Sequence, residues 1–179
     1  MTSYWNASPS AETACPLLVL GATIKIWGSR GERSVNIDDF FVGPGKSVLC
    51  RGEIVKGIEI PFPEGTLGTS YQKLGRRKAM EIAIVNVAVA IKRDENICVE
   101  AKIALGAVAP VPMRALKAES ILSGVPWTEE AVEEAAVAAA EACQPISDIR
   151  ASEWYRRKMV KVLVKRGLRD AWNRSGLRL

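Results

Sequence analysis

The chain has 179 residues, of which 48% are hydrophobic and 25% charged, a balance that excludes wholesale disorder. No apolar run approaches the roughly 20 residues that a membrane-spanning helix needs, and the first residues lack the features of a signal peptide, so we expect a cytoplasmic protein with no membrane partner. Histidine is absent, which excludes Ser-His-Asp and Cys-His catalysis and histidine-ligated metals.

The net charge of +5 is unevenly distributed, because residues 150–179 contain ten Lys or Arg and only two acidic residues. A basic segment that also contains Trp154 and Trp172 is a candidate for nucleic-acid binding. The same segment has an apolar stripe at helical spacing, formed by Val160, Val164, Leu168 and Ala171. This stripe predicts a helix that packs on a core, and we expect Tyr155 and Leu163 to lie against the sheet together with Val160 and Val164. We favour the packed helix and keep the nucleic-acid arm as the alternative.

The first third of the chain is predicted to form short strands separated by turns. The strands are expected at residues 22–27, 33–37 and 53–60, where apolar and polar residues alternate. Residues 28–32 fit a hairpin loop, and Gly43-Pro44-Gly45 fits a turn. Pro61, Pro63, Gly65 and Gly68 mark a boundary, so we divide the chain into residues 1–66 and residues 67–179.

The remaining residues are predicted to form three strands and then three helices. The strands are expected at 70–74, 82–91 and 97–108, with a hairpin turn at 93–96. Pro112 is predicted to open a helix that ends at Ser123, and Thr128 is predicted to cap a helix over 129–143. The third helix is expected at 152–172. This order predicts an α+β fold in which a three-stranded antiparallel sheet packs on a layer of three helices.

Motifs with chemical meaning are few. Gly43-Pro44-Gly45-Lys46-Ser47 resembles the end of a P-loop, but Phe40 stands where the first glycine is required, so we interpret it as a turn. A G-x-G-x-x-G motif is absent. The four cysteines are far apart in the sequence, which argues against a metal site and favours small buried side chains.

Two segments remain as candidates for binding. Lys73-Leu74-Gly75-Arg76-Arg77-Lys78 is either a solvated loop or a site where the Lys73 ammonium holds an anion or an electron-rich ring. Residues 6–13 are short and mostly polar, and they offer caps or hydroxyl donors near a helix start. Both segments have a structural interpretation beside the functional one.

Taken together and in order, several segments resemble the FAD-binding medium subunit of molybdenum hydroxylases, the family of carbon monoxide dehydrogenase and xanthine dehydrogenase flavoproteins. The similarity covers nearly the whole chain and depends on the combination rather than on one motif. The segments that carry it are Asn6-Ala7-Ser8-Pro9-Ser10-Ala11-Glu12-Thr13-Ala14-Cys15-Pro16-Leu17-Leu18, Asp39-Phe40-Phe41-Val42-Gly43-Pro44-Gly45-Lys46, Glu53-Ile54-Val55, Tyr71-Gln72-Lys73-Leu74-Gly75-Arg76-Arg77, Ala104-Leu105-Gly106-Ala107-Val108-Ala109-Pro110 and Arg150-Ala151-Ser152-Glu153-Trp154-Tyr155-Arg156-Arg157.

The resemblance implies residue roles in an FAD site. It places Ser8 in the cofactor-binding segment and Glu12 at a carboxylate that contacts the adenosine part of FAD, where the family more often has aspartate. It places Val55 against the isoalloxazine ring and Lys73 in a hydrogen bond to the flavin. It implies no catalytic residue and no metal ligand in this chain.

The resemblance also implies partners. Molybdopterin is expected on a large subunit and [2Fe-2S] clusters on a small subunit, with FAD relaying electrons to an acceptor. Residues 2–5 replace the family's glycine-rich entry, and the family's pyrophosphate loops have no counterpart in these 179 residues. We therefore expect residues 1–66 to be an incomplete second FAD-binding subdomain. The chain is then a fragment, a truncated product or one partner of a split subunit, and in the last case a separate N-terminal FAD-binding half would complete the site. The alternative, from another functional class, is a non-enzymatic interaction module that uses the basic C-terminal helix to bind nucleic acid or a partner protein.

Overall fold

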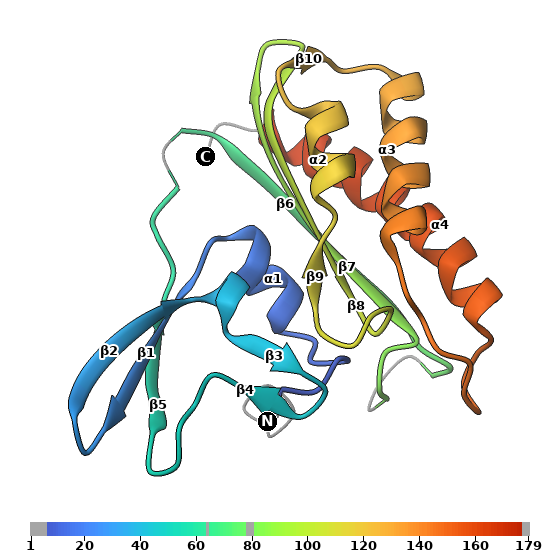
Figure 1. The fold of residues 1–179 in the computed structure, drawn as a ribbon. Helices are drawn as coiled ribbons and strands as arrows, with labels where there is room; N and C mark the ends of the chain where they lie inside the picture. The colour runs from blue at the N-terminus through green and yellow to red at the C-terminus, as the bar shows by residue number, and fades with distance from the viewer. Residues whose placement is uncertain (1–6, 64, 78–80, 177–179) are drawn as a thin grey trace.

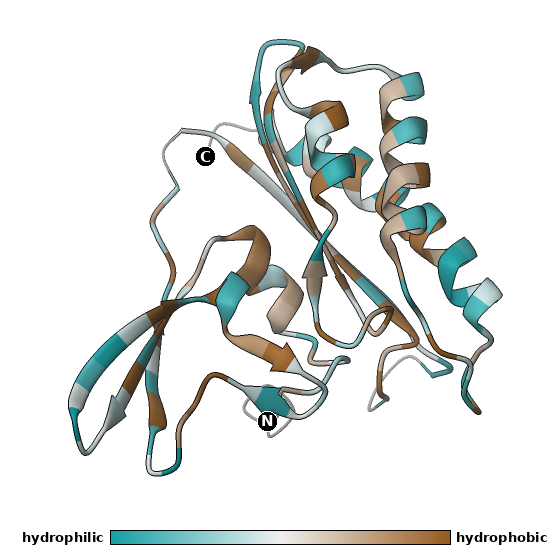
Figure 2. Ribbon diagram, viewed as in Figure 1, coloured by the Kyte–Doolittle hydropathy of each residue, from teal (hydrophilic) through white to brown (hydrophobic). Residues whose placement is uncertain are grey.

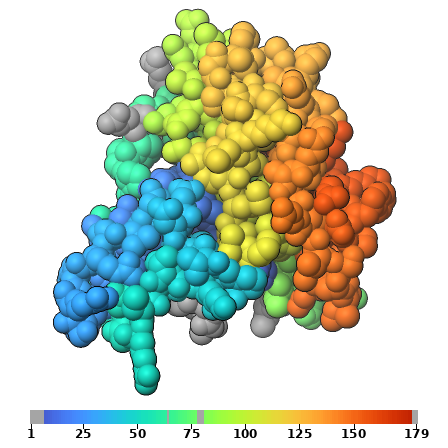
Figure 3. Space-filling view, viewed as in Figure 1, coloured from blue at the N-terminus to red at the C-terminus, as the bar shows by residue number. Residues whose placement is uncertain are grey.

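The computed structural model describes residues 7–63, 65–77 and 81–176, so residues 2–5 and Lys78 lie outside the described residues. Figure 1 shows two lobes, one formed by the chain up to β5 and the other by the sheet and helices that follow. In the space-filling view the first lobe, blue and cyan, lies directly against the yellow part of the second lobe (Figure 3).

The first lobe consists of short elements. They are α1 (Ala14–Val19), β1 (Thr23–Gly28), β2 (Gly31–Asn36), η1 (Ile37–Asp39), β3 (Phe41–Gly43), β4 (Lys46–Ser47) and β5 (Ile54–Glu59). Strands β2, β1 and β5 form an antiparallel sheet in that order, which confirms the three predicted strands. Strands β3 and β4 form a separate hairpin, and Gly45 turns it with a left-handed φ of 68°. The interpretation of this glycine-rich segment as a turn is confirmed.

The second lobe contains the larger sheet and three helices. Its elements are β6 (Leu67–Leu74), β7 (Val85–Asp94), β8 (Ile97–Gly106), β9 (Met113–Arg114), α2 (Leu116–Leu122), β10 (Val125–Pro126), α3 (Glu129–Ala142) and α4 (Glu153–Ser175). The strand order is β10-β8-β7-β6, with β9 also paired to β8, and every pair is antiparallel. The three predicted strands are the long members of this sheet, and the two-residue strands β9 and β10 widen it to five.

One helix boundary was predicted wrongly. Pro112 does not open α2, because Met113 and Arg114 first pair with β8 and the helix begins at Leu116. The N–H of Ala115 donates to the carbonyl of Ile103 (2.8 Å), which fixes the chain on the sheet for these residues. A free strand edge therefore prevailed over the preference of proline for a first helical turn.

The sheet is covered on both faces, as the alternation along β7 requires. Val85, Val87, Val89 and Ile91 belong to the core shared with α2, α3 and α4. Ala88 and Ala90 belong to the core shared with α1 and β1 on the opposite face. Alanine there lets α1 approach the strands closely, so the first lobe packs on the face that the three helices leave free.

Helix α4 confirms the interpretation of a packed helix. The predicted stripe of Val160, Val164, Leu168 and Ala171 is fully buried, and the helix lies over β6 and β7. Tyr155 was expected against the sheet, but it is 38% exposed in the first turn of the helix. Figure 2 shows hydrophilic and hydrophobic segments alternating along α3 and α4, as expected for helices with one buried side.

Candidate functional site

The segment that precedes α1 is held between two loops. The N–H of Gly45 in the β3–β4 turn donates to the carbonyl of Ala7 (3.1 Å), and the N–H of Ala107 after β8 donates to the carbonyl of Pro9 (2.8 Å). Ala7 is buried and has a left-handed φ of 47°. These contacts fix the backbone of residues 7–9, and they therefore restrict where the nearby Glu12 side chain can lie.

Lys73 lies near the end of β6, the edge strand of the larger sheet. Because side chains alternate along a strand, Gln72 points toward α4, where its amide donates to the Asp170 carboxylate (2.7 Å). Tyr71 and Lys73 therefore lie on the opposite face of the sheet. The Lys73 Nζ donates to the Glu12 carboxylate (2.5 Å) and to the carbonyl of Glu81 (2.7 Å). The Glu12–Lys73 ion pair thus joins the two lobes, and it remains partly open to solvent.

Tyr71 adjoins this ion pair on the same face of β6. Burial raises the pKa of its phenol, and the negative charge of Glu12 raises this pKa further, with a smaller effect from Cys15. The phenol therefore stays protonated throughout the physiological pH range and can donate a hydrogen bond. A cation, an anion and a neutral donor meet at this position.

Asn86 lies on β7 directly opposite Lys73, and Gly106 lies opposite Asn86 on β8. The Asn86 side chain is fully buried, and neither Oδ1 nor Nδ2 has a hydrogen-bond partner among the described residues. A methyl group on Gly106 would lie 2.5 Å from Oδ1, so only glycine leaves room for the amide. Buried amides without a partner are rare, because each destabilises a fold by about 1–3 kcal/mol. The unpartnered Asn86 amide is therefore unusual for a buried group beside Lys73.

The other two predicted site residues lie elsewhere. The Ser8 hydroxyl is 3.0 Å from the Ser10 hydroxyl and accepts the Ser10 N–H (3.4 Å), within the turn before α1. Val55 lies on β5, opposite Ile26 of β1, and packs on the core of the first lobe. The structure joins Glu12 to Lys73 directly and places Val55 in the smaller sheet, and the cofactor-binding roles of all four residues stay predictions.

Two family models match the chain. The one described as CO dehydrogenase flavoprotein C-terminal domain matches residues 69–171, more than half of the chain. The one described as FAD binding domain in molybdopterin dehydrogenase matches residues 3–63. This chain belongs to the family of FAD-binding medium subunits of carbon monoxide and xanthine dehydrogenases. The two matches leave residues 64–68 between them, and a domain boundary at 66/67 stays a prediction.

Individual members of this medium-subunit family resemble the chain over most of its length. The glyceraldehyde dehydrogenase medium chain of Sulfolobus acidocaldarius is 37% identical over 165 residues, which are 92% of this chain and 58% of that protein. The xanthine dehydrogenase FAD-binding subunit of Escherichia coli O157:H7 is 30% identical and covers 97% of this chain. The chain spans about 60% of the length of these relatives.

A solved structure of a family member confirms the α+β fold. Carbon monoxide dehydrogenase from Hydrogenophaga pseudoflava, in a form that lacks the Mo-pyranopterin moiety, superposes with a TM-score of 0.93 at 32% identity. The match covers 96% of this chain and 60% of that one. The family therefore provides both lobes in the arrangement described above.

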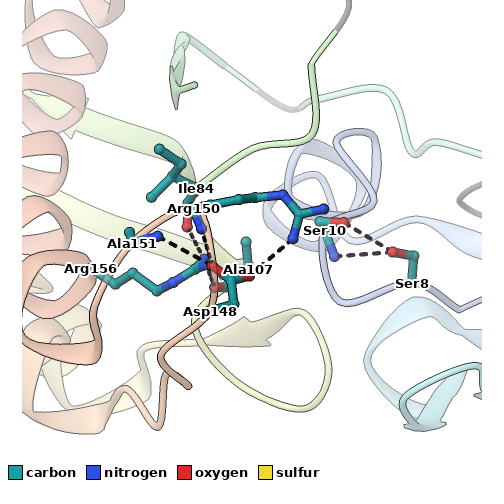
Figure 4. A network of polar contacts seen from close by, with 8 residues as sticks. All are labelled: Ser8, Ser10, Ile84, Ala107, Asp148, Arg150, Ala151 and Arg156. Carbon is teal, nitrogen blue, oxygen red and sulfur yellow. Dashed lines mark hydrogen bonds and ion pairs between the residues drawn. The ribbon is translucent and has the colours of Figure 1, made fainter. Parts of the chain in front are cut away.

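Sequence reasoning missed a polar network around the buried Arg156 (Figure 4). Arg156 on α4 is 3% exposed and donates to the carbonyls of Ile84 (2.6 Å) and Ala107 (3.1 Å) and to the Asp148 carboxylate (2.7 Å). A hollow of about 340 Å³ adjoins the network and is also lined by Ser10. The segment containing Arg156 carried the family resemblance, but only the fold reveals what the guanidinium contacts.

Cysteine and metal chemistry can be assessed within the described ranges. Three of the cysteines are buried, as expected, and burial raises the pKa of Cys98 to about 11 and of Cys143 to about 12. Cys50 is exposed, which corrects the expectation for that residue, because it lies in the loop before β5 rather than in a core. Residues 7–63, 65–77 and 81–176 contain no cluster of three metal-ligating side chains. No helix among these residues is long and apolar enough to cross a membrane.

Proposed function

We propose that this chain supplies the C-terminal part of an FAD site in a molybdenum hydroxylase. In that role FAD relays electrons from iron–sulfur clusters on a small subunit to an acceptor, and the substrate is oxidised at molybdopterin-bound molybdenum in a large subunit. Membership in the medium-subunit family supports this proposal. The observation that carries it is the Glu12–Lys73 ion pair at the junction of the lobes, which joins two residues that the resemblance assigns to FAD.

The residues at this junction suit the edge of an isoalloxazine ring. The pyrimidine part of the ring presents one N–H donor between two carbonyl acceptors. The Glu12 carboxylate can accept from the N–H, while the Lys73 ammonium and the Tyr71 phenol can donate to the carbonyls. Because Glu12 binds Lys73, we assign both to the ring edge, in place of the adenosine contact that the resemblance implies for Glu12.

Bound FAD would supply a centre that takes up electrons one at a time, as iron–sulfur clusters deliver them, and passes them on singly or as a pair. The chain's own contribution is electrostatic and positional. A fixed ammonium at the pyrimidine edge stabilises negative charge on the reduced ring, and charge-assisted hydrogen bonds orient the ring. The buried Asn86 amide lies opposite Lys73 on the neighbouring strand, and its two polar atoms have no hydrogen-bond partner among the described residues.

A first prediction is that these 179 residues bind FAD weakly and purify without colour. The family's glycine-rich pyrophosphate loops have no counterpart among them, and backbone amides of such loops supply most phosphate contacts. Each lost charge-assisted hydrogen bond weakens binding by about 1.5–3 kcal/mol. Titration of FAD followed by fluorescence quenching measures the affinity. Stoichiometric, submicromolar binding by this chain alone would contradict the half-site interpretation.

A second prediction concerns the reconstituted site. Adding a polypeptide with the glycine-rich half of a relative's flavin domain should restore yellow colour. In that complex Lys73→Ala should weaken FAD retention about tenfold or more, or shift the flavin potential. Lys46→Ala, in the β3–β4 hairpin, is the matched control and should do neither. Equal FAD affinity and potential for the two variants would remove Lys73 from the site.

The alternative of a nucleic-acid arm finds no support in the contacts of α4. Lys161 and Lys165 both bind Glu133 of α3, and Arg169 binds Glu129. These cations are engaged within the fold, and the apolar stripe between them is buried. We therefore propose no second function.

A further inference from the structure

One buried guanidinium reaches both chain segments that form the Glu12–Lys73 ion pair. Arg156 extends from the first turns of α4 to the open end of the larger sheet (Figure 4). One of its terminal nitrogens donates to two backbone carbonyls, of Ile84 at 2.6 Å and of Ala107 at 3.1 Å. These carbonyls lie just before β7 and just after β8, where the ladder of the sheet no longer pairs them.

Through Ala107, Arg156 is connected to the segment that carries Glu12. Ala107 has a left-handed φ of 62°, which is unfavourable for a residue other than glycine and persists only where the surroundings fix it. Its carbonyl accepts from Arg156, and its N–H donates to the carbonyl of Pro9 (2.8 Å). Pro9 lies three residues before Glu12, so the guanidinium fixes the peptide that anchors the carboxylate segment.

Through Ile84, Arg156 is connected to the segment that carries Lys73. The N–H of Ile84 donates to the carbonyl of Leu74 (2.8 Å), the residue that follows Lys73 on β6. The carbonyl of Glu81, three residues before Ile84, accepts from the Lys73 Nζ. Arg156 therefore fixes the segment that returns along β6 and holds the ammonium.

The guanidinium is itself held in one orientation. Its other terminal nitrogen donates to Asp148 Oδ1 at 2.7 Å, and the same carboxylate accepts the backbone N–H groups of Arg150 and Ala151. A lysine at position 156 has a single nitrogen and cannot reach three separated acceptors with a planar fork. The arrangement is thus specific for arginine.

We propose that Arg156 is the positioning residue of the candidate flavin site: it holds in register the two segments that carry Glu12 and Lys73. This inference rests on the proposed function only for the role of the ion pair in binding flavin, because the effect of Arg156 on the two segments can be measured on the chain without flavin. If FAD does not bind, the effect of Arg156 on the two segments can still be observed. If Arg156 has no such effect, the FAD titration still tests the proposed function separately.

The test compares Arg156→Lys with Arg157→Lys, a change at the next residue, which is partly exposed and binds Glu153. Native-state amide exchange measures the N–H groups of Ala107 and Ile84, and brief acylation followed by mass spectrometry measures the reactivity of the Lys73 amine relative to Lys46. In Arg156→Lys we expect exchange at both amides to accelerate about tenfold and Lys73 labelling to rise about threefold or more, well below the melting temperature. In Arg157→Lys the amide exchange at Ala107 and Ile84 and the labelling of Lys73 should both match the wild type.

A purely structural role for Arg156 would lower the melting temperature without these local changes. Wild-type exchange at Ala107 and Ile84, together with wild-type labelling of Lys73, would overturn the proposal. If Arg156→Lys does not fold, Asp148→Ala removes the acceptor that orients the guanidinium and keeps Arg156 itself, and the same two readouts apply. Local acceleration at these positions in Asp148→Ala supports the proposal, and its absence contradicts it.

Discussion

At the scale of single residues, Gly68 sets how closely α4 approaches the sheet. It lies on β6 under the last turns of the helix, and a methyl group there would fall well inside van der Waals contact of the Ala171 carbonyl and the Ser175 backbone nitrogen. Because both are backbone atoms of one helix, they cannot move aside separately. We expect Gly68→Ala to lower the free energy of unfolding by about 2–4 kcal/mol, measured by urea denaturation.

The matched control for this substitution is Gly57→Ala. Gly57 is also a strand glycine, on β5, and a methyl group there meets no atom within 4 Å. The control should change stability by less than about 0.5 kcal/mol. Equal effects of the two substitutions would show that close packing at Gly68 does not limit the approach of α4.

Candidate roles for single residues came mainly from the family resemblance, and these roles stay predictions. Glu12 and Lys73 were identified in this way, although their positions 61 residues apart gave no sign that they bind each other. Asn86 and Gly68 were not identified, because their importance depends on which backbone lies above each strand. Strand register and helix position are properties of the folded chain, and the sequence pattern alone does not determine them.

At the scale of elements, a second prediction of stability concerns the buried stripe of α4. Val164 lies on the side of α4 that packs on the sheet, and its side chain is fully buried. Val164→Asp places a carboxylate in this core without a partner, so we expect the free energy of unfolding to fall by about 3–5 kcal/mol. Thermal or urea unfolding measures the loss. Asn173→Asp on an exposed position of the same helix is the control and should stay within about 0.5 kcal/mol of wild type.

Regular elements were largely predictable because their periodicity reports burial directly. The alternation of β7 and the apolar stripe of α4 each match a buried face. The short strands β9 and β10 were not predictable, since two-residue pairings depend on a neighbouring edge rather than on local pattern. Pro112 was misinterpreted for the same reason: its helix-opening preference was real, but the chain first paired with β8.

At the scale of the whole molecule, charge is distributed so that the basic C-terminal segment is partly neutralised within the fold. Glu129 and Glu133 on α3 bind Arg169, Lys161 and Lys165 on α4. Exposed pairs of this kind contribute little individually, but a shared carboxylate with two cations forms a small network. The charge asymmetry seen in the sequence therefore appears in the structure as a contact between neighbouring helices.

This distribution predicts how stability depends on pH. Hydrogen bonds from Lys161 and Lys165 lower the pKa of Glu133 from 4.5 to about 2, and a hydrogen bond from Arg33 lowers that of Glu53 to about 2. Burial opposes the shift at Asp148, but hydrogen bonds from Arg150, Arg156 and Ala151 prevail and lower its pKa from 3.8 to about 2. A depressed pKa means that the folded state binds these protons less readily than the unfolded state.

The stabilisation by these three carboxylates is therefore fully present above pH 4.5 and is lost as the pH falls from 4.5 to about 2. We expect the melting temperature to be nearly constant from pH 7 to pH 5 and to fall steeply below pH 4.5, as followed by circular dichroism. Glu133→Gln removes one contributor, so its melting temperature should fall less steeply in that range. Glu134→Gln, at an exposed neighbouring position, should keep the wild-type slope. If Glu133→Gln kept the wild-type slope as well, the network between α3 and α4 would not couple protonation to folding.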